Sequence, residues 1–400
     1  MSASRSQDPT TRPLPGAPAD RGGATLANWR TSPFHRWAFQ HAREIMPTAD
    51  IPAATNPLAL RHEPRSLDGL RITTSGAELD LEQLLRATHT DAFAIVHAGT
   101  LIYEHYDHGM TARTPHVVMS STKSVVGLVV GILCERGQLD VTAPVDHYVP
   151  ELAASAYRGA AIQHLLDMRV DMELSAADHA AYQAATGWDP LAPGQPDRSL
   201  HDYLVGLTAP AKPHGGPFRY LSANTDLLGW VIERATGRRF AELVSELLWQ
   251  PMGAEHPAYI TVDRAGAPRC TGGLCATLRD FARLGQLLVQ GGRRDGVAIV
   301  PEAWLDDTER NGDPDAWRTG EFAPGFRGLR MRYRNHWYVI DDEPRMLFAM
   351  GIHGQNLFVD RANQIVIAKL SSQAAPIAPA ALDLIHRAIP QIVRHVATGT

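Results

Sequence analysis

The pattern of hydrophobic and polar residues predicts strands near both ends of the chain and helices between them. Asp91–Tyr106 is typical of a β-hairpin, because two runs rich in β-branched and aromatic residues flank the turn residues His97-Ala98-Gly99. Near the other end, similar runs predict a meander with a turn at Asp360–Asn363. Its strands are expected around Arg330–Ile340, Met346–Ile352, Asn356–Val359 and Gln364–Leu370.

One predicted helix differs from the others because it is apolar on nearly every face. This segment, Ser121–Arg136, is followed by Gly137 and should lie inside the protein rather than on its surface. The other helical patterns have one apolar face and recognisable ends. They cover Phe34–Met46, Ile162–Met168, Leu200–Leu207, Thr225–Thr236 followed by Gly237, Thr277–Gln290 with Thr277 as N-cap, and Pro379–Val396.

This order of elements predicts an α+β fold made of two domains. We expect an α/β sandwich with a central antiparallel sheet, formed by residues 29–150 and 272–400, and an inserted all-α domain at 151–271. Residues 1–28 are rich in Pro, Gly and Arg and are expected to be a disordered lead. The active site is expected in the cleft between the two domains.

Composition excludes several classes of function. The chain has 400 residues, 44% of them hydrophobic and 20% charged, with a net charge of -5 and a pI near 6.4. Nothing in it suggests a basic surface for nucleic acid, a secretory signal or a membrane span. Three scattered cysteines predict neither a disulfide framework nor a zinc site. We expect a cytoplasmic protein without a membrane partner, and the sequence is compatible with a homodimer.

The first candidate for chemistry is Ser120-Ser121-Thr122-Lys123, at the front of the buried helix. The chain has 38 basic residues, and only Lys123, Lys212 and Lys369 are lysine. Arginine keeps its proton in a protein, whereas a buried lysine can lose it and act as a base. Lys123 follows Ser120 by one helical turn, so it could activate a serine nucleophile. The alternative is an N-capping serine followed by a lysine whose amine reaches solvent.

Two further segments carry candidate residues. In Phe218–Asp226, Tyr220 could act as a proton shuttle once a nearby ammonium lowers its pKa, while Ser222 and Asn224 could hold Lys123 or a substrate carbonyl. An ordinary N-capping loop is the alternative. In Gly351-Ile352-His353-Gly354-Gln355, the flanking glycines leave the backbone open, so a strand-edge N–H could stabilise an oxyanion. A plain β-turn is the alternative there.

Together the three segments resemble the serine β-lactamase and penicillin-binding-protein superfamily, in which Ser-x-x-Lys, a tyrosine motif and a strand-edge triplet line one cleft. Within it, further matches resemble the 6-aminohexanoate-dimer hydrolase (nylon-oligomer hydrolase) family. These matches are Arg36-Trp37-Ala38-Phe39, Thr90-Asp91-Ala92-Phe93, Tyr148–Ala153, Leu166-Asp167-Met168, Ser222–Asp226, Ile260–Asp263 and Gly351–Leu357.

The resemblance implies a β-lactamase/transpeptidase-like fold and a role for each matching residue. Ser120 would be the acylated nucleophile, with Lys123 and Tyr220 as its base and proton relay. The N–H groups of Ser120 and Ile352 would form the oxyanion hole. Trp188 matches a tryptophan that closes over the substrate. The remaining candidates for substrate contact are Ser222, Asn224, Thr271, His353 and Ile377.

The sequence also departs from the nylon-oligomer hydrolases. The loop between Met168 and Trp188 is shorter, and Tyr182 and Gln183 only approximately occupy the positions of a tyrosine and an aspartate that hold the amide dimer. Thr271 stands where those enzymes carry asparagine, and Ile377 where they carry tyrosine. Carboxylesterase activity, which the family shares, is therefore the better supported half of the expected function.

The leading interpretation is a serine hydrolase that cleaves short-chain esters, and linear amides as a further class, without a metal or organic cofactor. The alternative is a β-lactamase or D-alanyl-D-alanine carboxypeptidase. The lack of a visible secretory signal argues against it, and Ala349-Met350-Gly351 stands where those enzymes carry Lys-Thr-Gly. The third interpretation is a non-catalytic binding module of the same fold, which the joint presence of Ser120, Lys123 and Tyr220 disfavours.

Overall fold

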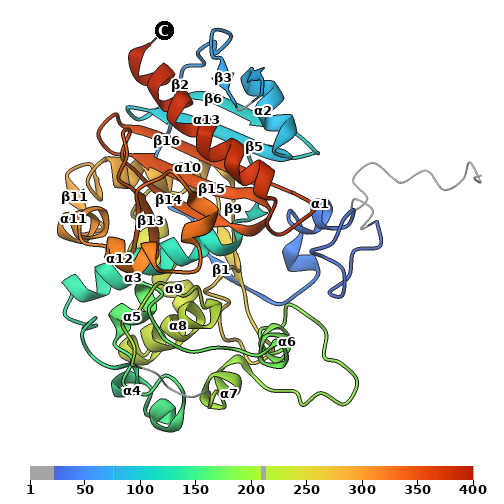
Figure 1. Ribbon diagram of the computed structural model, residues 1–400, viewed down its shortest axis with the longest axis vertical. Helices are drawn as coiled ribbons and strands as arrows, with labels where there is room; N and C mark the ends of the chain where they lie inside the picture. Colours follow the sequence, from blue (N-terminus) through green and yellow to red (C-terminus); the bar gives the residue numbers. More distant parts are fainter. Residues whose placement is uncertain (1–21, 75, 209–212, 400) are drawn as a thin grey trace, which may run out of the picture.

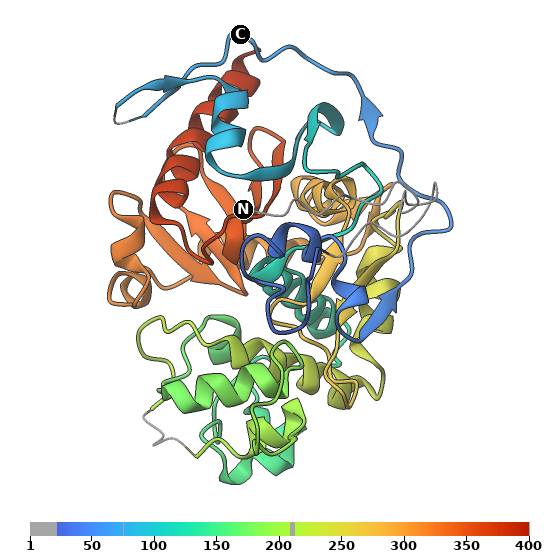
Figure 2. The ribbon, with the colours of Figure 1, turned by 90° about the vertical axis from the view of Figure 1, so that its right-hand side faces the viewer.

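The computed structural model describes residues 22–74, 76–208 and 213–399. Its upper part in Figure 1 contains a large sheet with helices on both faces, and its lower part is mostly helical. Figure 2 shows the same two parts from the side, with the segment from α4 to α8 gathered below the sheet. The arrangement confirms the predicted fold class, a central sheet combined with an inserted helical part.

The central sheet contains eight strands in the order β12-β13-β14-β15-β16-β5-β6-β2. Strands from the two ends of the chain meet where β16 pairs with β5, and the predicted hairpin and meander are both confirmed. Neighbouring strands are antiparallel except for the β2–β6 pair. The strands are β12 Met331–Arg334, β13 Trp337–Ile340, β14 Met346–Gly351, β15 Gln355–Asp360, β16 Ile365–Ser371, β5 Thr90–His97, β6 Thr100–Tyr106 and β2 Arg61–His62.

Both faces of this sheet are buried, which explains the nearly continuous apolar strands. Helix α10 (Leu278–Val289) packs against β15, β16 and β5 on one face. Helices α13 (Pro379–Thr398) and α2 (Leu81–Ala87) cover the other face. In β16, Val366 and Ala368 belong to the first face, while Ile365 and Ile367 belong to the second. Strand alternation therefore places Lys369 on the face covered by α13.

The helix predicted to be buried is α3 (Thr122–Glu135), and the prediction is confirmed. Every residue from Thr122 to Leu133 is buried, between the sheet and the helical part. Close packing explains the glycines in this helix, because a Cβ atom at Gly127 would lie 2.2 Å from the carbonyl oxygen of Asn335. Lys123 is consequently carried by a helix that cannot move independently of the core, and Ser120 lies in the turn directly before it.

The helical part also follows the predicted pattern, with one shifted boundary. Gly237 ends α8 in a left-handed conformation with φ of 67°, as predicted, but the helix begins at Ser222 rather than Thr225. Ser222 and Asn224 therefore lie in the first helical turn and not in a preceding loop. The helices here are α4 Val145–Tyr148, α5 Ile162–Leu166, α6 Ala176–Ala185, α7 Leu200–Val205, α8 Ser222–Thr236 and α9 Phe240–Val244.

Two predicted segments differ from the structure. The range expected to be all helical contains strand β8 (Ala258–Thr261), whose residues are all buried. It belongs to a second sheet with the order β1-β8-β9-β7. The helix predicted over Phe34–Met46 is broken into α1 (His35–Ala38) and a 3-10 turn, because the carbonyl oxygen of Phe39 accepts the N–H of Val117 instead of continuing the helix.

The other strands of the second sheet are β1 Thr48–Ile51, β9 Leu274–Ala276 and β7 His116–Val117. The smaller elements are β3 Ile72–Thr73, β4 Glu78–Leu79, β10 Arg293–Arg294, β11 Val297–Ala298, α11 Glu302–Arg310 and α12 Pro314–Arg318. Of the expected N-terminal lead, residues 1–21 lie outside the described residues, and residues 22–28 form turns in which Ala24 is buried. In the part of the chain described, no helix combines the length and the apolar character needed to cross a membrane.

Candidate active site

Ser120 lies in a short 3-10 turn (Met119–Ser121) between β7 and α3. The preceding residue, Met119, has a positive φ of 47°, which is uncommon for a residue with a side chain. The hydroxyl of Thr122 donates to the carbonyl oxygen of Met119 over 2.7 Å and holds this turn. Ser120 is thereby presented at the wall of a pocket, before the buried helix begins.

Lys123 lies directly behind the serine. Its Nζ atom is 2.9 Å from Ser120 Oγ and donates to the carbonyl oxygen of Thr271 over 2.8 Å. Burial lowers the pKa of Lys123 well below its ordinary value, and the nearby Arg269 charge lowers it further, while Asp226 acts in the opposite direction. Burial therefore favours the neutral amine, which is the state that accepts a proton from serine.

Tyr220 completes the group of three at the pocket wall. Its ring centroid is 4.7 Å from Lys123 Nζ, and its side chain hydrogen-bonds with Ser120. Burial raises the pKa of Tyr220, in contrast to the lowering expected from a nearby ammonium. The hydrogen bond with Ser120 and the charge of Arg269 lower this pKa, but their effect is smaller than that of burial. The physical reason is that burial removes the hydration that the charged phenolate would need. Tyr220 thus holds its proton in the resting site.

The end of strand β14 lies against the nucleophile. A Cβ atom at Gly351 would be 2.6 Å from the carbonyl oxygen of Val118 and 3.0 Å from the backbone nitrogen of Ser120. Ser120 and Ile352 both line the same pocket. The structure therefore brings together the two backbone segments whose N–H groups were predicted to form an oxyanion hole.

A buried charged network supports Lys123 from behind, and the sequence reasoning missed its main member. Arg269 donates to the carboxylate of Asp226 and to the hydroxyl of Tyr182, and all three side chains are buried. The other Asp226 oxygen accepts the N–H of Thr271 over 2.8 Å. The network fixes the Thr271 carbonyl that holds Lys123. No sequence motif marks Arg269, because its partners are distant in the chain.

Several residues predicted to touch substrate do not line the pocket. Asn224 is fully buried, and its Oδ1 accepts the hydroxyl of Tyr157 over 3.1 Å. His353 is also fully buried, with Nδ1 2.6 Å from the carbonyl oxygen of Gln373. Both side chains are taken up by the core because the backbone directs them away from the cavity. The structure thus does not place these two side chains on the pocket wall, and a substrate contact by either stays a prediction.

Trp188, Thr271 and Ser222 lie next to the catalytic group without lining the pocket. The indole N–H of Trp188 donates to Thr261 Oγ1 over 3.0 Å, and its ring packs edge-on against Trp29. The hydroxyl of Thr271 donates to the carbonyl oxygen of Ser222 over 2.8 Å. Of these three residues, Thr271 contacts Lys123 directly, through its carbonyl oxygen. Ile377, in contrast, is 62% exposed and lies on the pocket wall.

The pocket beside Ser120 has a volume of about 320 Å³ and a mostly apolar wall. Tyr220 stacks on Phe322, with ring centroids 5.0 Å apart, and the N–H of Tyr220 donates to Glu321 over 2.5 Å. The apolar lining comes from β13, β14, a 3-10 turn and the start of α13. It consists of Phe322, Phe326, Tyr338, Met350, Ile352, Pro376, Ile377, Ala378, Ala381, Leu382 and Ile385. Such a wall suits a short hydrocarbon chain.

Polar residues also line this pocket, namely Glu321, Asn356, Lys369 and Gln373. The sequence reasoning did not find Asn356 or Lys369, although the rarity of lysine was a signal for Lys369. Among the described residues, no group of three or more His, Cys, Asp or Glu side chains is placed to hold a metal ion.

The fold and the site define a serine hydrolase of the β-lactamase type. Residues 80–390 match the family model described as Beta-lactamase. The chain is 35% identical to the 6-aminohexanoate-dimer hydrolase of Paenarthrobacter ureafaciens over 368 residues, which cover 90% of this chain and 91% of that protein. The chain thus belongs to the β-lactamase family and, within it, to the 6-aminohexanoate-dimer hydrolases.

Solved structures agree with this assignment. A Bacillus anthracis protein provisionally assigned as a 6-aminohexanoate-dimer hydrolase superposes with a TM-score of 0.86 at 29% identity, over 97% of this chain and 99% of that one. A family VIII carboxylesterase superposes with a TM-score of 0.56 at 18% identity, over 77% of this chain and 96% of that one. The second likeness concerns the fold alone.

Proposed function

We propose that this protein hydrolyses short-chain carboxylic esters, and linear amides more slowly, through an acyl-enzyme on Ser120. The observation that carries the proposal is the 2.9 Å contact between Lys123 Nζ and Ser120 Oγ at the wall of an apolar pocket. Burial lowers the pKa of Lys123 and so favours the free amine, the form that can act as a base toward a serine hydroxyl. The relative named 6-aminohexanoate-dimer hydrolase supports the amide class, and the apolar pocket beside Ser120 supports short-chain esters.

The proposed acylation step uses all three side chains. Lys123 takes the proton of Ser120 as Oγ attacks the carbonyl carbon, and the N–H groups of Ser120 and Ile352 bind the developing oxyanion. When the intermediate collapses, Tyr220 gives its proton to the leaving oxygen or nitrogen. The Lys123 ammonium then returns a proton to Tyr220. Both side chains regain their resting protonation states, so acylation leaves no net charge on them.

Deacylation runs the same relay in reverse. A water molecule beside Tyr220 loses a proton to the phenol oxygen as the phenol passes its own proton to Lys123. The resulting hydroxide attacks the acyl carbonyl, and Lys123 returns the proton to Ser120 Oγ when the acid is released. The raised pKa of Tyr220 keeps the phenol protonated at the start of each half-reaction, as this relay requires.

The test compares 4-nitrophenyl esters of graded chain length with 6-aminohexanoate dimer, using the wild-type protein and Ser120→Ala. We expect rapid turnover of the short esters, slow turnover of the dimer and an acyl adduct on Ser120 by intact mass spectrometry. Ser120→Ala should lose about a thousandfold or more in kcat. Its side chain makes no helix-capping bond, so the melting temperature should change little. Equal activity of Ser120→Ala would exclude this serine as the nucleophile.

A further inference from the structure

A buried lysine other than Lys123 lines the pocket. Lys369 lies on strand β16 and is 1% exposed, yet it lines the cavity that opens at Ser120. Strand pairing places it opposite Asn356 of β15, which also lines the cavity. Both residues belong to the sheet face covered by α13, whose residue Ala381 lines the cavity too, as does Ala378 at its N-cap. The catalytic mechanism uses none of these residues.

Lys369 is bonded only to uncharged oxygens. Its Nζ donates to the carbonyl oxygen of Gly354 over 3.2 Å, to that of Thr88 over 3.4 Å and to the hydroxyl of Ser371. Among the described residues, no carboxylate forms an ion pair with it. A buried cation normally has an anionic partner, because burial removes its hydration. Its three N–H donors all have neutral acceptors, two of them in long contacts of 3.2 and 3.4 Å, so what Lys369 lacks is a negative charge that could replace those contacts.

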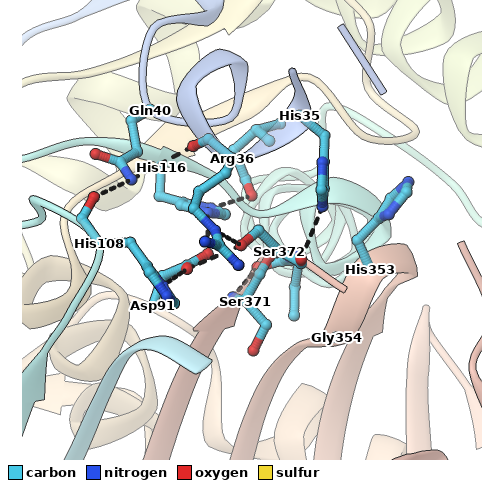
Figure 3. Close-up of polar contacts among 12 residues, drawn as sticks. His35, Arg36, Gln40, Asp91, His108, His116, His353, Gly354, Ser371 and Ser372 are labelled. Atoms are coloured by element: carbon cyan, nitrogen blue, oxygen red, sulfur yellow. Dashed lines mark hydrogen bonds and ion pairs between the residues drawn. The ribbon is translucent and has the colours of Figure 1, made fainter. Parts of the chain in front are cut away.

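Asp91 is the carboxylate that raises the pKa of Lys369, but its oxygens already accept hydrogen bonds from other side chains. Asp91 accepts hydrogen bonds from Ser372 Oγ over 2.9 Å and from His108 Nδ1 over 2.7 Å, and His116 Nε2 lies 3.4 Å from its second oxygen. Figure 3 shows these side chains gathered around Asp91. The acidic group that lines the cavity, Glu321, is bonded to the N–H of Tyr220 near the catalytic serine.

A second, independent donor points to the same ligand chemistry. Asn356 is 3% exposed, and its Nδ2 atom has no acceptor among the described residues. An unpaired buried amide is costly, so a ligand that pairs with it gains affinity. The first turn of the 20-residue helix α13 also borders the cavity, and no side chain caps it. Its N–H groups favour negative charge.

We propose that Lys369 and Asn356 bind a carboxylate carried by the non-reacting end of a linear ester or amide. The inference rests on the proposed function and names its substrate class more closely. The cavity wall between the two polar sites is apolar, with Met350, Leu382 and Ile385 among its residues. A short methylene chain with a reactive carbonyl at one end and a carboxylate at the other matches this cavity. The carbonyl would lie at Ser120, the methylene groups along the apolar wall and the carboxylate at Lys369 and Asn356. Half-esters of linear dicarboxylic acids are one such class.

The protonation of Lys369 provides an independent signature. Burial lowers its pKa to about 7, against the smaller raising effect of Asp91. As pH rises through this value the free enzyme loses the ammonium, so attraction for a carboxylate should fall. A neutral ester does not depend on that charge. The ratio of kcat/KM for an anionic ester to that for a neutral ester of equal length should therefore fall above pH 7.

The experiment compares mono-4-nitrophenyl glutarate with 4-nitrophenyl pentanoate, which differ at the end remote from the ester. A charged hydrogen bond predicts a preference of about tenfold to a hundredfold for the glutarate in kcat/KM at pH 6.5. Lys369→Met and Asn356→Asp should each reduce that ratio about tenfold or more, since one removes the cation and the other adds a competing carboxylate. Ile385→Val, which reshapes the apolar wall without changing charge, should leave the ratio unaltered.

A second arm places the carboxylate on the leaving group, comparing 4-acetoxybutanoate with butyl acetate. A preference that depends on Lys369 in either arm supports the proposal and shows which half of the substrate enters the cavity. Ratios near one in both arms, or variants that slow charged and neutral esters equally, would overturn it and indicate a structural lysine.

Ligand binding to the inactive variant Ser120→Ala tests the carboxylate site independently of ester hydrolysis. Calorimetry with Ser120→Ala should show monomethyl glutarate binding about tenfold or more tightly than methyl pentanoate, with the difference lost in Ser120→Ala/Lys369→Met. If no ester is hydrolysed, the proposed function fails while this measurement still decides the carboxylate site. Equal binding of the two compounds would contradict the site even if esters are hydrolysed.

Discussion

Lys123 and Lys369 are both fully buried, both line or adjoin one pocket, and in both burial lowers the pKa of the amine. Their partners differ. Lys123 lies 2.9 Å from a serine hydroxyl, with the charged pair of Arg269 and Asp226 behind it, whereas Lys369 is bonded to carbonyl and hydroxyl oxygens only. Lys123, beside a serine hydroxyl, can act as a base, whereas Lys369, beside the unpaired amide of Asn356, can bind an anion.

In our proposals Lys123 acts by transferring a proton, whereas Lys369 acts through its positive charge. Lys123→Arg keeps a positive charge but cannot give up its proton, so it should lower kcat by about a hundredfold to ten-thousandfold, nearly as much as Lys123→Ala. The measurement is kcat on 4-nitrophenyl butyrate. Lys369→Met should lower kcat on this neutral ester far less than Lys123→Ala does. Substantial activity in Lys123→Arg would mean that the lysine acts through its charge alone.

The oxyanion side of the site can be tested at Gly351. A Cβ atom there would lie 2.6 Å from the carbonyl oxygen of Val118 and 3.0 Å from the Ser120 nitrogen, so Gly351→Ala must displace the strand end that carries Ile352. We expect kcat on short esters to fall about a hundredfold, as for loss of one oxyanion donor. Gly216→Ala is the matched control, because nothing lies within 4 Å of its added Cβ. Full activity in Gly351→Ala would argue against this oxyanion site.

The ion pair of Asp226 with Arg269 can be used to test Lys123 through the pH dependence of kcat/KM. Asp226 raises the pKa of Lys123, so Asp226→Asn should lower that pKa further and move the acid limb of kcat/KM to lower pH. The variant also leaves Arg269 buried without its carboxylate, which should cost about 3–5 kcal/mol of unfolding free energy. Denaturant unfolding and a pH–rate profile measure the two effects. An acid limb that moves to higher pH would contradict the assignment of Lys123 as the base.

The fold could be predicted from the sequence, and so could the proximity of Ser120, Lys123 and Tyr220, but the surroundings of the two buried lysines could not. Hydrophobic periodicity located the hairpin, the meander and α3, and local spacing joined Ser120 to Lys123. The surroundings of Arg269 and Lys369 could not be predicted, because they depend on contacts between segments that are distant in the chain. Asn224 and His353 were assigned to the pocket because their neighbours match a motif, whereas side-chain direction depends on backbone geometry that a motif does not encode.

The smallest expected effect concerns the choice between ester and amide. Ile377 is exposed on the pocket wall, while the hydroxyl of Thr271 is bonded to Ser222 and its carbonyl oxygen holds Lys123. A tyrosine at 377 would add an aromatic surface and a hydroxyl where an amide chain leaves the pocket. Ile377→Tyr should therefore raise kcat/KM for 6-aminohexanoate dimer relative to the ester by a few-fold, up to about tenfold.

Adding Thr271→Asn should keep the amide-to-ester ratio above that of the wild type. The second substitution contributes less, because its side chain faces Ser222 rather than the cavity. The measurement is kcat/KM on both substrates for the wild type, each single variant and the double variant. A wild-type enzyme that already prefers the amide, or a Thr271→Asn effect larger than that of Ile377→Tyr, would show that substrate approaches the serine from the Thr271 side instead.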